Sequence, residues 1–324
     1  MKSSMIVTVL LAAVLAGCGA TGSAPQPSPP ASTSSAQVHT VETAFGPVSI
    51  PRSPRRAIAL EGGVGPLLQA GITPLATADG DYPDQFLPAE YQKVKDLPII
   101  LGKDGPDLEK IAALKPDLMI GFVRGGKAAE LSAEAKAQWQ KLNAIAPTVL
   151  IRSTGSSQTK DATLAMAEAL GHGEEAHAAK KAYEAKAADI RTKHAAVLSR
   201  HVFAAVDYYE KVNVYSPISW PGDTLVDAGA KLTPVSRDER QENATFLSLE
   251  QLGRLSDSTV LLYEQRPDDT PGEGATELLK QPTWRALPAV KASHAYGLPY
   301  FFADRYETGL ISLEALDTIL SRLE

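Results

Sequence analysis

The sequence predicts an α/β protein with two lobes of similar architecture separated by a long helix. Three observations predict this fold class. Residues 107–120 are echoed by residues 248–261, strands and helices alternate on both sides of the middle of the chain, and the middle itself is rich in Ala, Glu and Lys. Regular alternation of strands and helices is typical of lobes that contain a parallel sheet.

Each copy of the repeat predicts a short amphipathic helix followed by a buried strand. Asp107 or Ser248 can cap the helix, and apolar residues recur after it at every third position. Each helix carries a glutamate in its first turn, Glu109 or Glu250, where the helix dipole favours a carboxylate. The repeat therefore predicts that each lobe presents one acidic residue at an equivalent place.

The start of the chain predicts secretion and a lipid anchor. Lys2 precedes an apolar run from Met5 to Leu15 that is too short to span a membrane, so residues 1–17 are interpreted as a signal peptide. Cys18, the only cysteine, ends the motif Leu-Ala-Gly-Cys, which resembles a bacterial lipobox. That resemblance implies cleavage before Cys18 and acylation of its thiol. Ordinary secretion with an incidental cysteine is the alternative.

Composition then divides the rest of the chain. Residues 18–37 are rich in Ser, Thr, Pro, Ala and Gly without apolar periodicity, which predicts a disordered tether. Residues 38–158 are assigned to an N-terminal α/β lobe, 159–199 to a connecting helical segment and 200–324 to a C-terminal α/β lobe. The net charge of −6 and the lack of a basic tract argue against a nucleic-acid partner.

The N-terminal lobe shows the alternation most clearly. Apolar runs predict its strands, and a Gly-rich turn opens its first helix. The predicted strands are at 58–60, 75, 118–120 and 148–151, and the predicted helices pass through 67–68, 108–114 and 139–142.

The connecting segment is predicted to be helical. Gly171 and Gly173 punctuate a first helix, and residues 174–197 contain neither Gly nor Pro. A single helix over 174–197 would be more than about 30 Å long at a rise of ~1.5 Å per residue. Its central place favours a rigid spine between two lobes over an ordinary surface helix.

The C-terminal lobe repeats the alternation. A strand at 202–206 leads into a predicted loop, residues 208–220, that is rich in aromatic residues. A helix that stops at Gly229 follows. The remaining predicted elements are the Glu250 helix, a strand at 260–262, the segment 282–290, a strand at 295–298 and a closing helix.

Six short segments occur in a characteristic order along the chain: 55–60, 108–111, 115–120, 146–148, 248–250 and 284–290. Together with the lipobox, this set resembles the periplasmic-binding-protein family that serves iron-siderophore and cobalamin ABC importers. The resemblance implies two Rossmann-like lobes joined by a single long spine helix, with the ligand held in the cleft between them. It also implies that Glu109 and Glu250 dock on the two ABC permease subunits. Carboxylates that serve only the helix dipole are the alternative.

Ligands of open α/β sheets lie beyond the carboxyl ends of the strands, so residues just after strands are the candidate ligand contacts. Arg124 is favoured because its guanidinium offers a planar fork of donors, although a solvated loop arginine is the alternative. Of the adjacent Tyr208 and Tyr209, one is expected to line the cleft and the other to pack. The full set of candidates is Glu61, Tyr82, Arg124, Tyr208, Tyr209, Trp220, Arg266 and Arg305.

These predictions favour a non-enzymatic, extracytoplasmic, lipid-anchored protein that captures a ferric siderophore and delivers it to a permease. The expected partners are the permease subunits, a small-molecule iron chelate and the membrane that holds the anchor, and the protein is expected to be a monomer. Arginines mixed with acidic residues in the cleft loops favour a hydroxamate over a triscatecholate. Cobalamin and haem are the alternative ligands.

Other classes of function receive less support. The histidines do not converge on the cleft, so a site for a bare metal ion is not expected, and no cofactor besides the ligand is implied. A cell-surface hydrolase is a distant alternative, because the chain lacks a Gly-x-Ser-x-Gly elbow, a Walker loop and a dinucleotide fingerprint.

Overall fold

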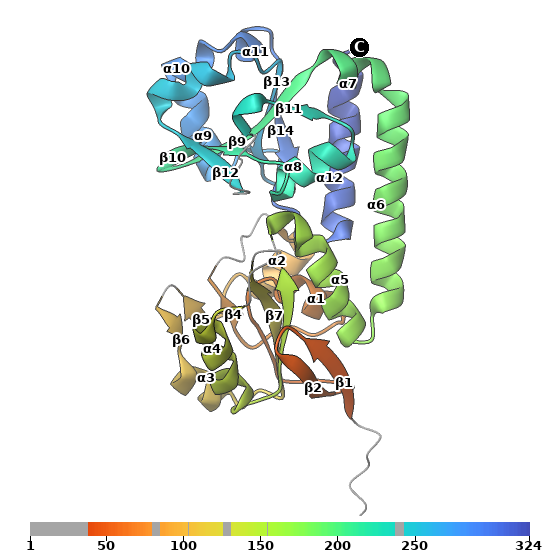
Figure 1. The fold of residues 1–324 in the computed structure, drawn as a ribbon, viewed down its shortest axis with the longest axis vertical. Helices are drawn as coiled ribbons and strands as arrows, with labels where there is room; N and C mark the ends of the chain where they lie inside the picture. Colours follow the sequence, from red (N-terminus) through yellow and green to blue (C-terminus); the bar gives the residue numbers. More distant parts are fainter. Residues whose placement is uncertain (1–37, 80–84, 103, 126–130, 154, 237–242) are drawn as a thin grey trace, which may run out of the picture. The chain divides into compact units, whose positions relative to one another are not determined.

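Two α/β lobes lie along a long helix in the computed structural model of the chain (Figure 1). The structure describes residues 38–79, 85–102, 104–125, 131–153, 155–236 and 243–324, which belong to one compact unit spanning 37–324. The predicted signal peptide, the tether and Cys18 lie outside the described residues. No helix in the described part of the chain is long and apolar enough to cross a membrane.

The N-terminal lobe is organised around strand β7 (Leu118–Arg124). It pairs in parallel with β3 (Ala57–Ala59) on one side and with β8 (Thr148–Ser153) on the other. Backbone hydrogen bonds between residues 75–76 and β3 continue this sheet to β4 (Thr77–Ala78), which pairs in parallel with β5 (Ile99–Gly102). The strands predicted at 58–60, 118–120 and 148–151 are confirmed.

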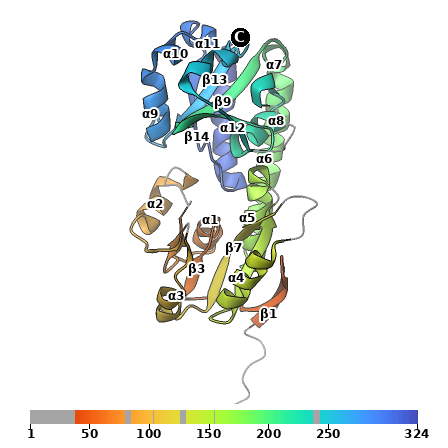
Figure 2. The same ribbon diagram turned by 60° about the vertical axis from the view of Figure 1, so that its left-hand side comes forward.

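Helices cover both faces of this sheet, which explains why its strands are apolar throughout. Alternate residues of β7 point to opposite faces: Ile120 packs with Leu67, whereas Met119 packs with Ile111 and Leu142. Figure 2 shows the helices of this lobe around its strands. The remaining elements of the lobe are the hairpin β1 (Val38–Thr43) and β2 (Gly46–Pro51), β6 (Gly105–Pro106), α1 (Val64–Gln69), α2 (Pro88–Val94), α3 (Leu108–Leu114) and α4 (Ala133–Asn143).

The connecting segment contains the spine helix. After the short helix η3 (Ser156–Gln158), α5 (Thr159–Ala169) packs on the N-terminal lobe and turns into α6 (Gly173–Lys193), whose 21 residues span about 31 Å at ~1.5 Å per residue. The helix predicted over 174–197 is wrong at its end, because α6 stops at His194 and α7 (Ala195–Arg200) begins a new helix. The fold class of two Rossmann-like lobes joined by one long spine helix is confirmed.

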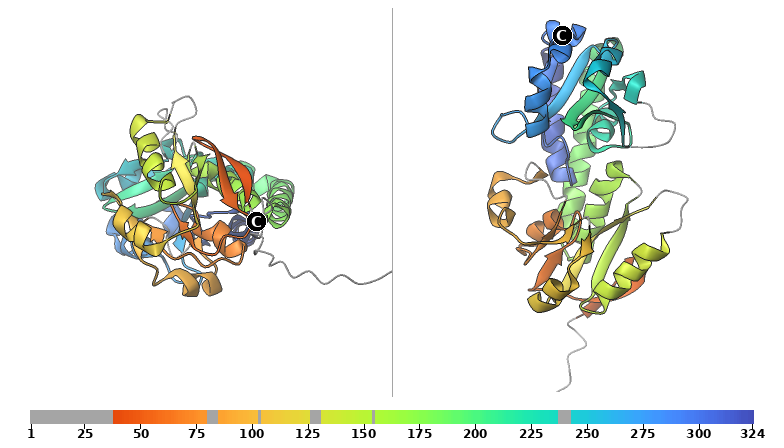
Figure 3. Two further views of the ribbon diagram at one scale, coloured as in Figure 1. Left: turned by 90° about the horizontal axis from the view of Figure 1, so that it is seen from below. Right: turned by 90° about the vertical axis from the view of Figure 1, so that its left-hand side faces the viewer.

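His194 explains where the spine ends. Its ring is buried, with Nε2 at 2.6 Å from a carboxylate oxygen of Asp317 and Nδ1 at 3.1 Å from one of Glu324. A side chain held between two acidic residues of the C-terminal segment ties the end of α6 to α12 (Tyr306–Ser321). Figure 3 shows α12 running beside α6.

We expect His194→Ala to lower the free energy of unfolding by roughly 1–3 kcal/mol, because it opens a void and removes one hydrogen bond to Asp317, which keeps Lys186 and Lys193 as partners. Urea unfolding followed by circular dichroism measures the effect. His177→Ala is the matched control, since His177 pairs with Glu168 at the surface, where such pairs contribute little. Equal effects of the two substitutions would contradict this account of the spine.

The C-terminal lobe is organised around strand β9 (Val202–Tyr209). It pairs in parallel with β13 (Val260–Gln265), which pairs in parallel with β14 (Ala295–Pro299). On its other side β9 pairs antiparallel with β10 (Lys211–Tyr215), so the sheet is mixed. The loop predicted for residues 208–220 is therefore wrong in its first half. Glu210 adopts a left-handed conformation, φ 59°, that reverses the chain within one residue and starts β10.

The other elements of this lobe cover the two faces of its sheet. Phe203 and Ala205 face the cluster that contains α6 and α12, whereas Ala204 and Val206 face the cluster that contains Trp284. These elements are α8 (Trp220–Asp227), β11 (Lys231–Leu232), η4 (Pro234–Ser236), β12 (Ala244–Leu247), η5 (Leu249–Leu255), α9 (Glu273–Lys280), α10 (Pro282–Arg285) and α11 (Pro288–Lys291). The Glu250 helix predicted from the repeat is present as the 3-10 helix η5.

Candidate functional site

A cavity of about 990 Å³ lies between the lobes, where the carboxyl ends of strands from both sheets meet. Its N-terminal wall is formed by Asp79, just after β4, and by residues in and before α2. Its C-terminal wall is formed by the ends of β9 and β13, by β10, and by the first residues of α8 and α9. Strand ends are where ligands of open α/β sheets bind, so this cavity is the candidate site.

Aromatic side chains dominate the walls. Trp220 packs edge to face on Phe302 with ring centroids 5.8 Å apart, and Phe302 contacts Tyr215 in the same way at 5.7 Å. The aromatic lining residues are Phe86, Tyr91, Tyr208, Tyr209, Tyr215, Trp220 and Phe302. Such rings offer apolar faces together with a few polar edges, which suits a large amphipathic ligand.

Trp220 carries the clearest polar signal. Ser219 caps α8 by accepting a hydrogen bond from the Gly222 N–H at 3.0 Å, and this fixes Trp220 at the first helical position. The indole Nε1 is buried without a hydrogen-bond partner in the described part of the chain. A buried donor normally has an acceptor, so this N–H is a candidate donor to an oxygen atom of a ligand.

Arg124 and Glu61 lie together outside the cavity lining, next to its residue Trp220. Arg124 ends β7, and its Nε and Nη2 donate to one Glu61 carboxylate oxygen at 3.0 and 2.5 Å. The guanidinium also lies 5.1 Å from the ring centroid of Phe122 and 5.5 Å from that of Trp220. Arg124 therefore reaches from the N-terminal lobe to a residue of the cavity wall, as a partner of Glu61 and not as an isolated cation.

Three other predicted residues line the cavity itself: Tyr208, Tyr209 and Arg266. Tyr209 is 80% exposed, whereas Tyr208 is half-buried and also packs on the core beneath the sheet. The two tyrosines thus share the wall, although the sequence predicted one lining and one packing side chain. Tyr82 lies outside the described residues.

Arg305 does not line the cavity, and its role as a ligand contact stays a prediction. It is buried just before α12, with Nη2 at 2.5 Å from Glu90, Nη1 at 3.0 Å from Asp304 and Nε at 3.2 Å from Glu307. Burial opposes its charge, but Asp304 and Glu90 outweigh this and raise the pKa of the guanidinium. Because Glu90 belongs to α2, the ion pair joins the two lobes instead of facing a ligand.

The sequence missed part of the wall because it missed β10 and α2. Asn213 on β10 faces Asp207 on β9, and its amide donates to that carboxylate at 2.5 Å, while the Tyr215 hydroxyl donates at 2.8 Å. Burial raises the pKa of Asp207, and the two hydrogen bonds act against that rise. Alternating Val212 and Val214 were the signal for a strand here.

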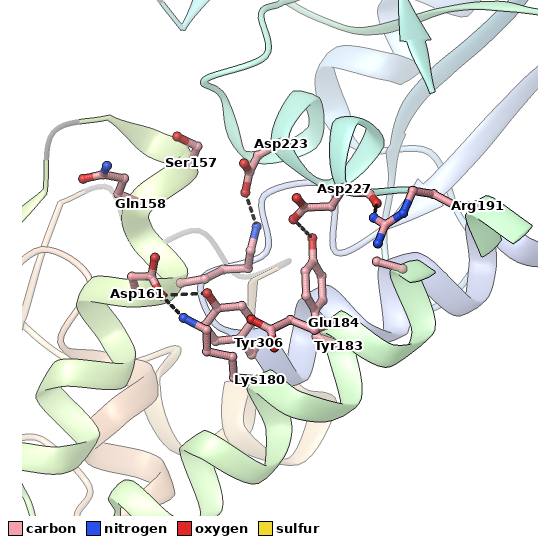
Figure 4. A pocket seen from close by; sticks show the side chains of 12 residues that line it. Ser157, Gln158, Asp161, Lys180, Tyr183, Glu184, Arg191, Asp223, Asp227 and Tyr306 are labelled. Carbon is pink, nitrogen blue, oxygen red and sulfur yellow. Dashed lines mark hydrogen bonds and ion pairs between the residues drawn. The ribbon is translucent and has the colours of Figure 1, made fainter. Parts of the chain in front are cut away.

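A second cavity of about 450 Å³ lies beside the spine and is lined by polar residues of α5, α6 and α8 (Figure 4). Asp161 accepts hydrogen bonds from Lys180 at 2.8 Å and from the Tyr306 hydroxyl at 2.7 Å, and Lys160 donates to Asp223 at 2.6 Å. These polar groups form hydrogen bonds with one another across the lobes. The second cavity is therefore a joint between the lobes and a poorer ligand site.

Glu109 and Glu250 lie away from both cavities, exposed in the first turns of α3 and η5. Asp107 caps α3 by accepting from the Lys110 N–H at 3.1 Å, and a hydrogen bond with Ser248 lowers the pKa of Glu250. The helix α3 leads into β7 and η5 leads into β13, which are equivalent inner strands of their sheets. The predicted equivalence of position is thus present, and the docking role stays a prediction.

Among the residues that the structure describes, no group of three or more His, Cys, Asp or Glu side chains is arranged to hold a metal ion.

Comparisons with known proteins agree with this architecture. Residues 66–300 match the profile of a family described as periplasmic binding protein. YhfQ of Bacillus subtilis, a candidate ABC transporter substrate-binding lipoprotein, is 27% identical over 91% of this chain and 90% of its own. YfiY of the same organism, a candidate siderophore-binding lipoprotein, is 27% identical over 91% of this chain and 89% of its own.

The solved structures include a similar protein as well. The siderophore periplasmic binding protein from the fuscachelin gene cluster of Thermobifida fusca is 30% identical, with a TM-score of 0.75 over 84% of this chain and 98% of that one. The likeness therefore extends over both lobes and the spine.

Proposed function

Since the chain belongs to the periplasmic binding protein family, we propose that it is the substrate-binding protein of an ABC importer and captures a ferric siderophore in the cavity between its lobes. The observation that carries this proposal is the aromatic cavity of about 990 Å³ with the unpaired Trp220 N–H in its wall. Its size is at the upper end of the range for small-molecule sites, which fits a bulky chelate. The descriptions of the two related lipoproteins and of the similar solved structure support the same ligand class.

Different residues of the cavity wall bind different parts of the chelate in this proposal. The aromatic rings cover the organic shell of the chelate, and the Trp220 N–H donates to one of its oxygens. Arg124 lies close enough to Trp220 to add a second donor at the border, while Glu61 fixes its orientation. A hydroxamate is the favoured iron ligand, because the walls mix an arginine with carboxylates instead of presenting the several cations that a triscatecholate requires. Cobalamin and haem remain the alternative occupants.

A lipid on Cys18 anchors the protein outside the cytoplasm, the protein acts as a monomer without catalytic turnover, and permease subunits receive the loaded form through Glu109 and Glu250. The related lipoproteins support the anchor and the transporter, and the equivalent positions of the two glutamates support the docking.

Titration of the soluble chain from residue 38 with ferric hydroxamates, ferric catecholates, haem and cobalamin tests the proposal. We expect saturable quenching of tryptophan fluorescence by one iron-chelate class after correction for inner-filter absorption. If none of these ligands quenches the fluorescence, or if the purified protein hydrolyses an ester substrate, the siderophore assignment is wrong.

Of the three tryptophans, Trp220 is the one that lines the cavity, so quenching of its fluorescence reports binding there. We expect Trp220→Phe to abolish most of the quenching and to weaken binding roughly tenfold by calorimetry, because it deletes one hydrogen bond and keeps the ring. Trp139→Phe is the matched control, since the Trp139 indole already donates to the Thr148 carbonyl at 2.9 Å within the N-terminal lobe. Unchanged affinity of Trp220→Phe would contradict the assigned ligand contact.

A further inference from the structure

Most of the charged side chains in the cavity wall are acidic. Five carboxyl groups and one guanidinium line it within the described residues: Asp79, Asp207, Glu264, Asp268, Glu273 and Arg266. Asp207 is satisfied by Asn213 and Tyr215, and burial raises its pKa, so its charge counts least. The neighbouring Arg124 is matched by Glu61 and adds no net charge.

Three of these carboxylates come from one short stretch of the C-terminal lobe, and we call Glu264, Asp268 and Glu273 the acidic wall. Glu264 lies near the end of β13, Asp268 lies in the turn that follows, and Glu273 begins α9. Arg266 lines the cavity from the same stretch, so three carboxylates face one guanidinium there. This side of the cavity is negative on balance and repels a negative group brought into it.

The acidic wall is held in place by its own turn. The Gly272 N–H donates to the Glu264 carbonyl at 3.0 Å, and the Glu264 carboxylate lies so close to Gly272 that a Cβ added there would be 2.2 Å from its Oε2. Thr270 donates to Asp268 through its N–H at 3.1 Å and its hydroxyl at 2.6 Å, and these hydrogen bonds lower the pKa of Asp268. Asp268 therefore keeps its negative charge over the whole neutral range.

The aromatic residues beside the acidic wall favour the same sign of charge. Tyr208 and Tyr209 line the cavity together with Glu273, and a Cβ added at Gly274 would be 2.2 Å from the Tyr208 carbonyl, so the start of α9 lies against β9. Faces of aromatic rings attract ammonium groups, and carboxylates add direct Coulomb attraction. An alkylammonium group can meet both features at once.

We propose that the acidic wall makes the site selective for ferric chelates that carry a positive charge, such as a pendant ammonium group, over neutral and anionic chelates. The inference rests on the proposed function and adds the charge class of the ligand. Selection acts at the C-terminal wall, while the aromatic rings and Trp220 bind the part of the chelate that all such ligands share.

A matched pair of ligands tests this selection. Ferrioxamine B carries a pendant ammonium group, and its N-acetylated form has the same iron centre without that charge. We expect calorimetry at low ionic strength to show roughly tenfold tighter binding of the cation, with the difference shrinking at high salt. Ferric dicitrate is the anionic comparison and is expected to bind more weakly than either.

Variants assign the effect to the acidic wall. We expect Glu264→Gln combined with Asp268→Asn and Glu273→Gln to abolish the preference for the cation, so that the two forms of the chelate bind with equal affinity. Glu277→Gln is the control, an acid-to-amide change on the same helix α9 outside the cavity lining. If the triple variant does not fold, Glu273→Gln alone, at the exposed start of α9, is expected to reduce the ratio of the affinities for the cationic and the acetylated chelate.

The outcomes separate this inference from the proposed function. Equal or tighter binding of the acetylated or anionic chelate by the parent protein would overturn the charge selection while an iron-chelate receptor remained. A preference for the cation that persists in the triple variant would overturn the role of the acidic wall. Failure of every iron chelate to bind would overturn the proposed function and the inference with it.

Discussion

A chain carrying Arg305→Met is expected to lose roughly 3–5 kcal/mol of its free energy of unfolding, because the substitution removes the shared partner of three carboxylates. The Arg305 side chain is 3% exposed, and those of Asp304 and Glu90 are 6% and 14% exposed. Without the guanidinium, the latter two carboxylates must either stay charged in a poorly solvated place or take up protons. Thermal and urea unfolding of the purified chain measure the loss.

Two further variants separate the ion pair from a general effect of removing an arginine. Arg285→Met, at an exposed position of α10, is expected to change stability by less than about 0.5 kcal/mol. Glu90→Gln alone is expected to destabilise, and Arg305→Met combined with Glu90→Gln is expected to cost less than the sum of the single changes, because one substitution relieves the charge left by the other. Strict additivity would show that the pair does not join the lobes energetically.

We expect uptake of the chelate to fall to the background in cells whose only binding protein carries Glu109→Ala and Glu250→Ala, while the purified variant binds the chelate with unchanged affinity. Both glutamates are exposed and lie outside the cavity lining, so their loss removes no ligand contact. In the proposed docking each glutamate makes one charged contact with a permease subunit, so the double variant is expected to dock weakly and each single variant to keep partial uptake. Radioactive iron uptake and calorimetry measure the two properties side by side.

The control for this experiment uses glutamates of the same local kind. Glu134 and Glu174 are exposed and lie in the first turns of α4 and α6, but neither belongs to the repeated segment. Glu134→Ala with Glu174→Ala should transport as the parent does. Normal uptake by the Glu109 and Glu250 double variant would disprove their docking role and leave the ligand assignment intact.

The sequence predicted the features that depend on local patterns. The echo of residues 107–120 in 248–261 places α3 before β7 and η5 before β13, because capping residues and apolar spacing act within a few residues. Both lobes and the spine followed from composition and alternation. Of the candidate ligand contacts, Tyr208 and Tyr209 at the end of β9 and Arg266 just after β13 line the cavity, because strand ends meet there.

The sequence failed where distant residues decide the outcome. Arg305 looks like a loop cation, but its environment is set by Glu90 in the other lobe. His194 sits in a helix-forming stretch, but Asp317 and Glu324 hold its ring and end the helix there. The β10 hairpin was missed because its turn is a single non-glycine residue, Glu210, without the usual turn signature.

The ion pair between Glu90 and Arg305 also has a consequence for the order of folding. The two residues are 215 positions apart in the chain, so their contact closes a very long loop. Such contacts form late, since the entropy of loop closure must be overcome before the contact contributes stability. On a ribosome, the N-terminal lobe emerges long before Arg305 does. The lobes therefore reach their final orientation only after the segment that begins α12 has been made. Until then Glu90 cannot form its ion pair with Arg305.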